Sequence, residues 1–482
     1  MKKKLSSILL FTLLTNFSYS QLNSDIDPNF HFSTNSLNLN VRNIIEQPNN
    51  KLIIAGFLNG DEIKRLNTDG TIDTNFELSD KTDIYQVHST ILTSENKVLV
   101  GGERIRINQW NTGWIDKKIV MLKSDGNLDT SFNGNGVGFN DTTLIIKIQN
   151  DGKILVGGKF TSYNNITHNR VIRLNSNGSI DETFNIGTGF DDTVNTIEIQ
   201  SDNKILIGGD FKKLNGLDKK YLVRLNSDGS IDNNFFIGSG PNKSVSCIKI
   251  QNDNKILVGG EFTSFKNVTF NHLVRLDLSG TTDTTFNIGQ GFTHSSSLST
   301  NQLEIKSITE FLNNIYVTGN FEKYDNNSSR DFVKIKENGD FDNSFNIGVG
   351  FVNGNGTERV NTLLFDVNRK LLLGGSFQLY NGVRKDFVLR LFGENSTLSL
   401  DNYQDNKILL FPNPVLDKVN IHNFKFSQNE KVQYEIYSLT GKRIKIGKLS
   451  NSVININELL NGYYILKLKN NNKIIYNKFL KL

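Results

Sequence analysis

TVNTIEIQSDNKILIGGDFKKLNGLDKKYLVRLNSDGSIDNNF (residues 193–235) decides the fold of this chain, because it is one complete copy of a unit that recurs along the sequence. Its β-rich runs are TIEIQ, KILIGG and YLVRL, and a shorter run, SIDNNF, ends the unit. The segments SDN, LNG and NSDG between the runs contain the residues that tight turns require. Four short runs joined by turns predict a four-stranded antiparallel meander.

The glycine-rich run marks the period of the repeat. It occurs seven times, at residues 51–56, 97–102, 153–158, 204–209, 255–260, 314–319 and 370–375. The intervals exceed the length of solenoid turns and fall at the long end of the range for propeller blades. We therefore predict an all-β, seven-bladed β-propeller over residues 21–395, with four-stranded antiparallel blades. We expect the paired glycines to let backbones approach closely, and the regularly spaced phenylalanines to pack between blades.

The run that ends each unit has the pattern D-x-x-F, and a copy of it, DIDPNF (25–30), precedes the first glycine-rich run. The seventh repeat stops after its third strand. We expect Asp27 and Phe30 to belong to the missing strand, so that the N-terminal segment closes the ring and leaves no open sheet edge. The alternative is a stray remnant beside a six-bladed ring.

Hairpin register makes this expectation specific. In RLNSNGSID (173–181) a three-residue loop places Arg173 opposite Asp181. The same count leaves Arg390 of the seventh repeat without a local partner. We expect Arg390 to face Asp27.

The repeated unit K-I-L-V-G-G-x-F…R-L-N-x-D-G-S-I-D-x-x-F resembles the delta-60 repeat, a β-propeller repeat of bacterial exported proteins. The resemblance covers roughly residues 25–395. The sequence departs from the family's pattern in two places. The first copy is shortened, and the second contains an irregular insert, RIRINQWNTGWID (104–116). The resemblance implies a propeller and no particular reaction.

The first 20 residues have the form of a secretory signal peptide. Three lysines precede an apolar stretch from Leu5 to Leu14, which is too short to span a bilayer, and small residues follow it. We expect cleavage between Ser20 and Gln21. No later stretch is long and apolar enough for a transmembrane helix, so we expect no transmembrane segment in the mature chain.

A polar linker (396–408) precedes alternating β-rich runs (409–482), which predict a small β-sandwich. This tail resembles the type A C-terminal sorting domain of type IX secretion substrates. The matching residues are Phe411, Pro412, Asn413, Pro414, Gly441, Lys442, Asn461, Gly462, Tyr463, Lys478 and Lys481. The resemblance implies that the type IX machinery is a partner and that the chain passes through the periplasm. It also implies that the tail is usually removed, with release or attachment at the outer-membrane surface.

Charge and motifs exclude several classes of function. Residues 21–403 hold 38 basic and 44 acidic residues, which argues against nucleic acid as a partner. Cys247 lies in an apolar run and is expected to be buried, without a disulfide partner. The six histidines have no ligand spacing, the D-G turns lack the acidic positions of a calcium loop, and no nucleophile or phosphate-loop motif occurs. We expect no metal and no cofactor. Carboxylates from different blades converging at the channel mouth stay possible.

Two functions remain open. The first is a non-enzymatic binding or scaffold module outside the cell, with an extracellular glycan or protein as ligand. The alternative is a secreted enzyme acting on polysaccharide or peptide, since propellers host both. The irregular segments 104–116 and 293–302 are the candidate ligand loops. Trp110 and Trp114 would stack on sugar, or would pack under a long loop.

Overall fold

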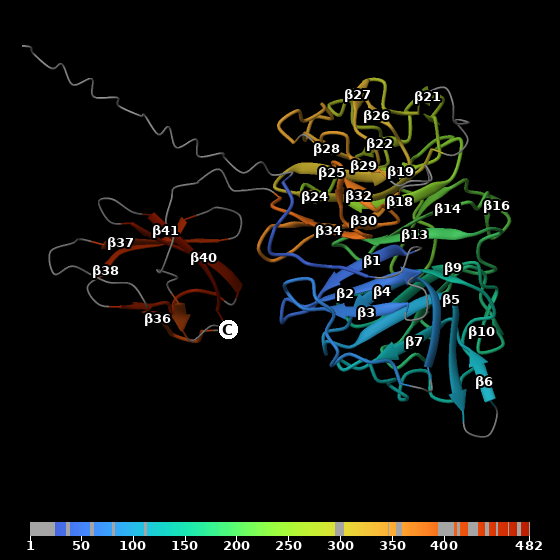
Figure 1. Cartoon of the computed structure of the whole chain (residues 1–482), viewed down its shortest axis with the longest axis horizontal. Coiled ribbons are helices and arrows are strands. Elements are labelled where there is room, and N and C mark those ends of the chain that lie inside the picture. The colour runs from blue at the N-terminus through green and yellow to red at the C-terminus, as the bar shows by residue number, and fades with distance from the viewer. Residues whose placement is uncertain are drawn as a thin grey trace, which may run out of the picture. The chain divides into compact units, whose positions relative to one another are not determined.

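The structure is a computed structural model of the 482-residue chain, with two compact units, Met1–Asn395 and Ser396–Leu482. It describes residues 25–34, 39–57, 62–79, 82–109, 113–294, 303–345, 347–352, 359–393, 409–411, 415–422, 432–438, 443–449, 452–460, 462–469 and 474–481. Within these ranges every regular element is a β-strand (Figure 1). The prediction of an all-β fold is confirmed.

Seven sheets of one pattern follow each other along the first unit, each with an inner, a middle and an outer strand. The first three are β1 (Asn40–Glu46), β2 (Leu52–Phe57), β3 (Ile63–Leu66); β4 (Thr82–Leu92), β5 (Val98–Gln109), β7 (Ile119–Leu122); and β8 (Thr143–Ile148), β9 (Ile154–Gly158), β12 (Val171–Leu174). The next two are β13 (Val194–Ile199), β14 (Ile205–Gly209), β17 (Leu222–Leu225) and β18 (Val245–Ile250), β19 (Ile256–Gly260), β22 (Leu273–Leu276). The last two are β24 (Ile305–Phe311), β25 (Asn314–Gly319), β28 (Phe332–Ile335) and β30 (Val360–Phe365), β31 (Leu371–Gly375), β34 (Val388–Leu391).

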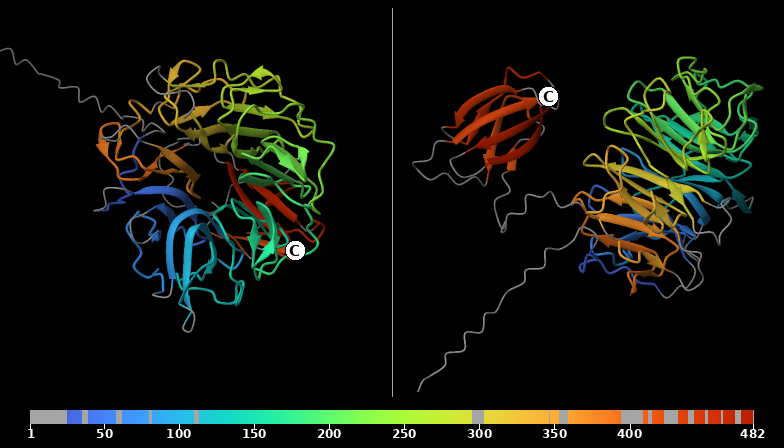
Figure 2. Two further views of the ribbon diagram at one scale, coloured as in Figure 1. Left: turned by 90° about the vertical axis from the view of Figure 1, so that its right-hand side faces the viewer. Right: turned by 90° about the horizontal axis from the view of Figure 1, so that it is seen from above.

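The sheets stand around a central axis as the blades of a propeller (Figure 2). Each inner strand contacts the inner strand of the next blade, and β30 contacts β1, so the ring is continuous. We number the blades from one to seven in the order above. The middle strands are buried along their length, because neighbouring blades cover both of their faces.

The fourth strand of each blade is shorter than expected. Single antiparallel bridges join the outer strands to the D-x-x-F segments, at Leu66–Ile72, Leu122–Leu128, Leu174–Ile180, Leu225–Ile231, Leu276–Thr282 and Ile335–Phe341. In blade seven the bridge joins Leu391 to Ile26. The aspartate that follows each bridge turns the chain, since its side chain accepts a hydrogen bond from the backbone two residues on, as in Asp232 to Asn234.

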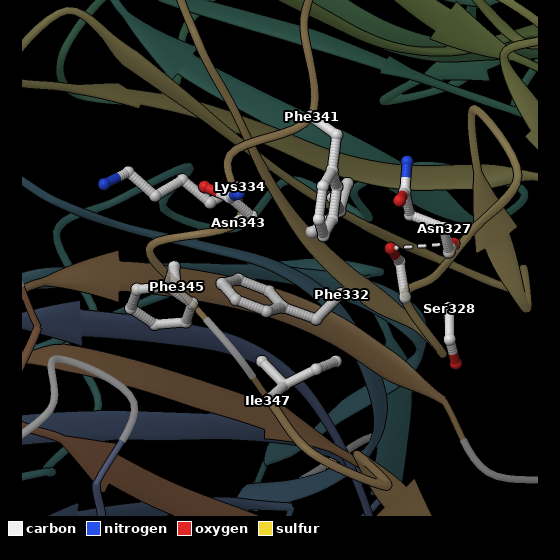
Figure 3. A pocket seen from close by; sticks show the side chains of 10 residues that line it. Asn327, Ser328, Phe332, Lys334, Phe341, Asn343, Phe345 and Ile347 are labelled. Atoms are coloured by element: carbon white, nitrogen blue, oxygen red, sulfur yellow. Dashed lines mark hydrogen bonds between the residues drawn. The ribbon is translucent and has the colours of Figure 1, made fainter.

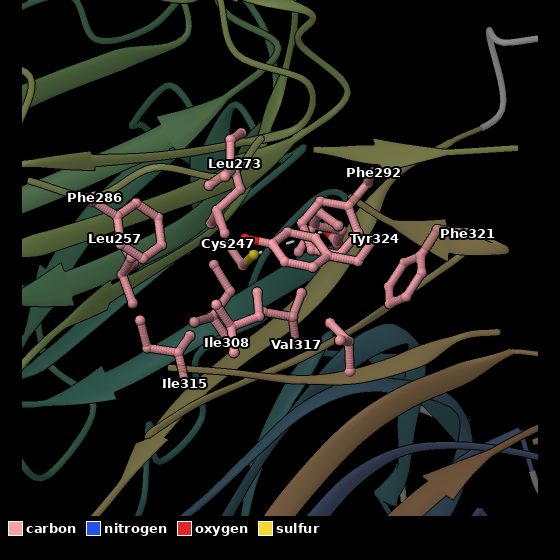
Figure 4. Close-up of a cluster of buried hydrophobic side chains, with 14 of the residues drawn as sticks. Cys247, Leu257, Leu273, Phe286, Phe292, Ile308, Ile315, Val317, Phe321 and Tyr324 are labelled. Atoms are coloured by element: carbon pink, nitrogen blue, oxygen red, sulfur yellow. Dashed lines mark hydrogen bonds between the residues drawn. The ribbon is translucent and has the colours of Figure 1, made fainter. Parts of the chain in front are cut away.

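The hydrophobic core lies between the blades. In one cluster, Cys247 and Leu257 of blade five pack against Ile308 and Phe321 of blade six (Figure 4). The Cys247 thiol is buried, and burial raises its pKa well above the ordinary value, so it acts as an apolar side chain.

The structure adds short hairpins that the sequence did not predict. They lie between the middle and outer strands: β10 (Ser162–Tyr163) with β11 (Ile166–Thr167), β15 (Lys213–Leu214) with β16 (Leu217–Asp218), β20 (Ser264–Phe265) with β21 (Val268–Thr269), β26 (Lys323–Tyr324) with β27 (Asn327–Ser328), and β32 (Leu379–Tyr380) with β33 (Val383–Arg384). In the last two, β23 (Phe292–Thr293) and β29 (Phe351–Val352) add a third strand. Each hairpin places one aromatic or leucine side chain in the core, such as Tyr163 or Leu214.

The second unit has two antiparallel sheets. One consists of β35 (Leu409–Phe411), β36 (Lys418–His422) and β39 (Val453–Asn455). The other has the order β38 (Arg443–Leu449), β37 (Val432–Ser438), β40 (Gly462–Lys469), β41 (Ile474–Lys481). Val419 and Ile454 of the first sheet share one core with Ile436 and Leu466 of the second, as in a small sandwich.

Candidate functional site

The N-terminal segment lies against the last blade. The Asp27 amide donates to the Arg390 carbonyl at 2.9 Å, and the Phe392 amide donates to the Asp25 carbonyl at 3.0 Å. The Asp27 carboxylate is fully buried between Arg390 Nε and Lys370 Nζ, each 2.7 Å from its Oδ2. Burial alone would raise the pKa of Asp27, but the hydrogen bonds from Lys370 and from the Asn29 amide, with the charge of Arg390, lower it below the ordinary value.

The same arrangement recurs inside the other blades. Arginine Nε lies 2.6–2.8 Å from the aspartate in the pairs Arg65–Asp73, Arg173–Asp181, Arg224–Asp232 and Arg275–Asp283. Lys334–Asp342 replaces it in blade six, and in blade two, where Met121 stands for arginine, only Lys97 reaches Asp129. In most blades the lysine of the glycine-rich run is therefore a second cation beside the aspartate. The recurrence of this lysine in the sequence would have indicated that role.

Each arginine also ties its blade to the next one. Arg390 Nη1 donates to the Thr68 carbonyl of blade one at 2.7 Å, as Arg173 does to Ser227 at 2.5 Å. The Arg390 guanidinium lies 4.7 Å from the centre of the Phe30 ring. Asp27, Phe30 and Arg390 therefore have structural partners throughout, and the arrangement stabilises the ring rather than offering a ligand site.

A different set of positions gathers at one end of the ring of inner strands, which we call the mouth. The inner strands begin at the end where the middle strands finish, as in the pairing of Val194 with Gly209. The residue at the β-bulge of each inner strand is half-buried there, and its identity changes from blade to blade: Arg42, His88, Leu144, Asn195, Ser246, Lys306 and Asn361. We call these seven residues the mouth ring. The residue after the glycine pair, at the same end, is equally variable: Glu103, Lys159, Asp210, Glu261, Asn320 and Ser376.

Mouth-ring side chains bind their neighbours across blades. Arg42 Nη1 donates to His88 Nδ1 of blade two at 2.8 Å, and Asn195 Nδ2 donates to Ser244 Oγ, at the start of blade five, at 3.2 Å. Burial, reinforced by the charge of Arg42, lowers the pKa of His88 to about 3, so the imidazole is neutral and accepts this hydrogen bond. Burial also raises the pKa of Glu261, and the negative charge of Glu304 adds to the effect.

Blade two carries an extension that projects beyond the other blades. Its strands β4 and β5 have 11 and 12 residues, against five to seven in the inner and middle strands elsewhere, and β6 (Gly113–Asp116) pairs with the end of β5. We call residues 82–85, 103–109 and 113–116 the finger. One face of the finger packs Ile84, Ile105 and Ile107 into the core. Trp114 lies on the other face and is 45% exposed, whereas Trp110 lies outside the described residues.

The segment 293–302 is only partly described. His294 is buried, with Nδ1 4.0 Å from Glu322 Oε1, and residues 295–302 lie outside the described ranges. Ser20, Gln21, Pro412, Asn413, Pro414, Gly441, Lys442 and Asn461 lie outside them as well, and Phe411 is described only as part of β35. In the sandwich, Gly462 pairs with Lys481, and Lys478 Nζ lies 4.1 Å from the centre of the exposed Tyr463 ring.

A cavity of about 210 Å³ lies beside blade six, lined mainly by Phe332, Phe341, Phe345 and Ile347 (Figure 3). It occurs in the blade where Lys334 takes the place of the arginine that elsewhere covers the phenylalanine ring. Ligand pockets commonly exceed about 300 Å³. A cavity of about 330 Å³ lies at the equivalent place in blade one, lined by Arg65, Asp73 and Phe76, so these cavities belong to the repeat and do not depend on the smaller cation.

Among the residues that the structure describes, no group of three or more His, Cys, Asp or Glu side chains has an arrangement that could hold a metal ion. The same residues contain no helix long and apolar enough to cross a membrane.

Comparison with known families identifies both units. The family described as "Domain of unknown function (DUF5122) beta-propeller" matches residues 47–76, 149–184, 200–235, 251–286 and 313–345. The family described as "Secretion system C-terminal sorting domain" matches residues 409–481. The chain therefore carries β-propeller repeats followed by a type IX sorting domain, and such a sorting domain implies secretion. No curated protein matches the sequence.

Several solved structures are similar at low sequence identity. PorZ, an essential surface component of the type IX secretion system of Porphyromonas gingivalis, is 11% identical, with a TM-score of 0.46 over 94% of this chain and 60% of that one. The extracellular domain of a putative one-component system from B. thetaiotaomicron is 13% identical, with a TM-score of 0.40 over 93% of this chain and 57% of that one. This chain thus spans 60% and 57% of the lengths of these two proteins.

Proposed function

We propose that this protein is a non-enzymatic binding or scaffold module that acts outside the cell, with a glycan or another protein as its ligand. The observation that carries the proposal is the contrast between constant and variable positions of the repeat. Arginine, aspartate and phenylalanine recur from blade to blade and build the ring, whereas the mouth ring has a different residue in every blade except for two asparagines. Variable side chains gathered at one end of a rigid scaffold are what ligand recognition by a propeller requires.

The proposal is tested with the purified protein on a glycan array and in pull-downs of cell-surface proteins, alongside hydrolysis assays on polysaccharides and peptides. Arg42→Ala and Lys306→Ala at the mouth ring, compared with Lys213→Ala on an outer hairpin, locate the binding surface. We expect a saturable ligand, weakened at least tenfold by a mouth-ring variant and unchanged by the hairpin variant. Turnover of any polymer would overturn the non-enzymatic assignment.

The alternative, a secreted enzyme acting on polysaccharide or peptide, has one supporting observation. Burial, with the negative charges of Glu304 and Asp210, raises the pKa of Glu261, and a carboxyl group with a raised pKa can serve as a general acid in hydrolysis. If turnover is found, Glu261→Gln should abolish it.

We further propose an export route. Residues 1–20 act as a signal peptide cut between Ser20 and Gln21, residues 396–408 are a linker, and residues 409–482 engage the type IX machinery and direct the chain to the extracellular space or the outer-membrane surface. Removing residues 409–482 should leave the propeller in the periplasm, as measured by fractionation and immunoblotting. Export of the truncated chain at the normal level would contradict this route.

A further inference from the structure

The outer face of the finger combines aromatic and cationic side chains in one row. Cross-strand register places Tyr85 opposite Arg104, Arg106 opposite both Asp83 and Asp116, and Asn108 opposite Trp114. Residues that pair directly, or that are two apart on one strand, share a face of the sheet. The order along this face is therefore Tyr85, Arg104, Arg106, Trp114, with about 7 Å between successive same-face residues of a strand.

The two arginines share a single carboxylate. Arg104 Nη2 lies 3.2 Å and Arg106 Nε 2.9 Å from the same oxygen, Asp83 Oδ2. Asp116 forms a separate ion pair with Lys118, whose Nζ lies 2.7 Å from Asp116 Oδ2. The face therefore carries one uncompensated positive charge, and the Arg104 side chain is 47% exposed.

An aromatic ring lies beside each of the two arginines. The Arg104 guanidinium carbon lies 5.4 Å from the centre of the Tyr85 ring, and that of Arg106 lies 5.5 Å from the Trp114 ring. Phe57 supports Tyr85 edge-on, with ring centroids 5.3 Å apart. A surface tryptophan beside a positive charge, on a sheet whose opposite face is anchored in the core, is a rigid platform with little conformational entropy to lose on binding.

We propose that the outer face of the finger binds an acidic saccharide, a chain of pyranose rings that carry carboxylates. The guanidinium groups of Arg104 and Arg106 donate hydrogen bonds to the carboxylate in the planar, bidentate manner that suits arginine, and Trp114 stacks on the face of a neighbouring sugar ring. A purely electrostatic partner such as an acidic peptide would use the arginines but would gain little from the flat Trp114 ring. This inference rests on the proposed binding function and names a ligand class and a surface for it.

The test is a calorimetric titration of the purified full-length protein with tetragalacturonic acid, with cellotetraose as the neutral comparison and hexaglutamate as the acidic-peptide comparison. We expect binding of the acidic saccharide only. Trp114→Ala, Arg104→Gln and Arg106→Gln should each weaken it at least tenfold. Phe236→Ala and Lys213→Gln, which alter an exposed aromatic and an exposed cation on other blades, should leave it unchanged. Thermal unfolding of each variant verifies folding.

The possible failures are distinguishable. Equal binding of cellotetraose, or binding that persists in Trp114→Ala, overturns the assignment of the surface. Equal binding of hexaglutamate with no effect of Trp114→Ala means that the partner is an acidic protein segment. No binding of tetragalacturonic acid, with a ligand found through the mouth ring, overturns this inference and leaves the proposed function intact. The absence of any ligand in all of these experiments contradicts both.

Discussion

Asp27 shows at the scale of one residue how the ring is held. Its carboxylate is buried with two cations, and its backbone amide pairs with the strand of Arg390. Isolated surface ion pairs contribute about 0–1 kcal/mol, but removing one partner of a buried pair costs about 3–5 kcal/mol, because the remaining charge loses both water and counterion. Asp27 belongs to the second class.

We therefore expect Asp27→Ala to lower the free energy of unfolding by about 3 kcal/mol. The matched control is Asp232→Ala, which removes the equivalent carboxylate inside blade four, where the chain is continuous. Urea denaturation of both variants measures the two losses. A loss below about 1 kcal/mol for Asp27→Ala, with a full loss for Asp232→Ala, would mean that the N-terminal segment does not hold the ring.

Two histidines, the half-buried His88 and the buried His272, make stability dependent on pH. Burial lowers the pKa of His88 to about 3 and that of His272 to about 4. In the unfolded chain both bind a proton below about pH 6.5. The unfolded state then holds more protons than the folded one, so stability is lost as pH falls from about 6.5 towards 4.

The expected loss is on the order of 1 kcal/mol per pH unit for each histidine within this window. His272→Asn preserves a donor to the Gly260 carbonyl, which His272 Nδ1 contacts at 3.1 Å, and should flatten the dependence. Thermal unfolding at pH 7.5, 6.0 and 4.5 measures it. An unchanged slope in His272→Asn would contradict this assignment.

At the scale of the strand, the two glycines of the glycine-rich run have different roles. A Cβ on Gly208 would meet Val245 Cγ1 of the next blade at 2.5 Å, which is a side-chain atom and not backbone. A Cβ on Gly209 would meet the Thr193 carbonyl oxygen of its own blade at 2.1 Å, next to the bulge between Val194 and Thr196. The first glycine permits close packing of blades, and the second permits the bulged pairing of the inner strand.

Gly208→Ala should therefore cost about 1–3 kcal/mol, the usual range for overpacking. Gly209→Ala should cost more, because a backbone carbonyl cannot rotate away as a side chain does. Chemical denaturation of both variants gives the comparison. An equal or smaller loss for Gly209→Ala would contradict the separate roles.

The positions of the main strands could largely be predicted from the sequence. The short hairpins and the extension between these strands were harder to predict. The runs around KILIGG and YLVRL form strands because two factors favour the same structure. Their apolar pattern and flanking turn residues favour strands, and the blade buries the same apolar residues. The outer hairpins, such as Lys213–Asp218, were missed because strands of two residues have too little local pattern and depend on the buried Leu214. In the finger, Arg104, Ile105, Arg106 and Ile107 alternate between the two faces, so the insert that we predict from the sequence to be an irregular loop begins as a strand with one buried face.

For the site, sequence register placed Arg390 opposite Asp27, and the structure brings the two together. Register is counted along two paired strands from equivalent positions of the repeat. The same count therefore applies where the two strands come from opposite ends of the chain. The shared use of Asp83 by two arginines, and the convergence of the mouth ring, depend on how strands from different positions assemble. No single stretch of sequence contains that information.

At the scale of the whole molecule, the N-terminal segment of the propeller, which precedes β1, pairs with its last strand, β34. Residues 25–30 hydrogen-bond to the end of β34, so the ring cannot close before residue 392 is available. Export or synthesis from the N-terminus therefore presents the closing segment long before its partner strand. Until then, the face of blade one that packs against Leu372 and Val388 has no cover.

Hydrogen exchange of the backbone amides tests this closure most directly. The Asp27 amide, bonded to the Arg390 carbonyl, and the Phe392 amide, bonded to the Asp25 carbonyl, report on the junction itself. The closed ring predicts protection of both that equals the protection of the Asp232 amide, which makes the same bond to Arg224 inside blade four. Exchange of the Asp27 and Phe392 amides at the rate of an unstructured terminus, with Asp232 protected, would contradict it.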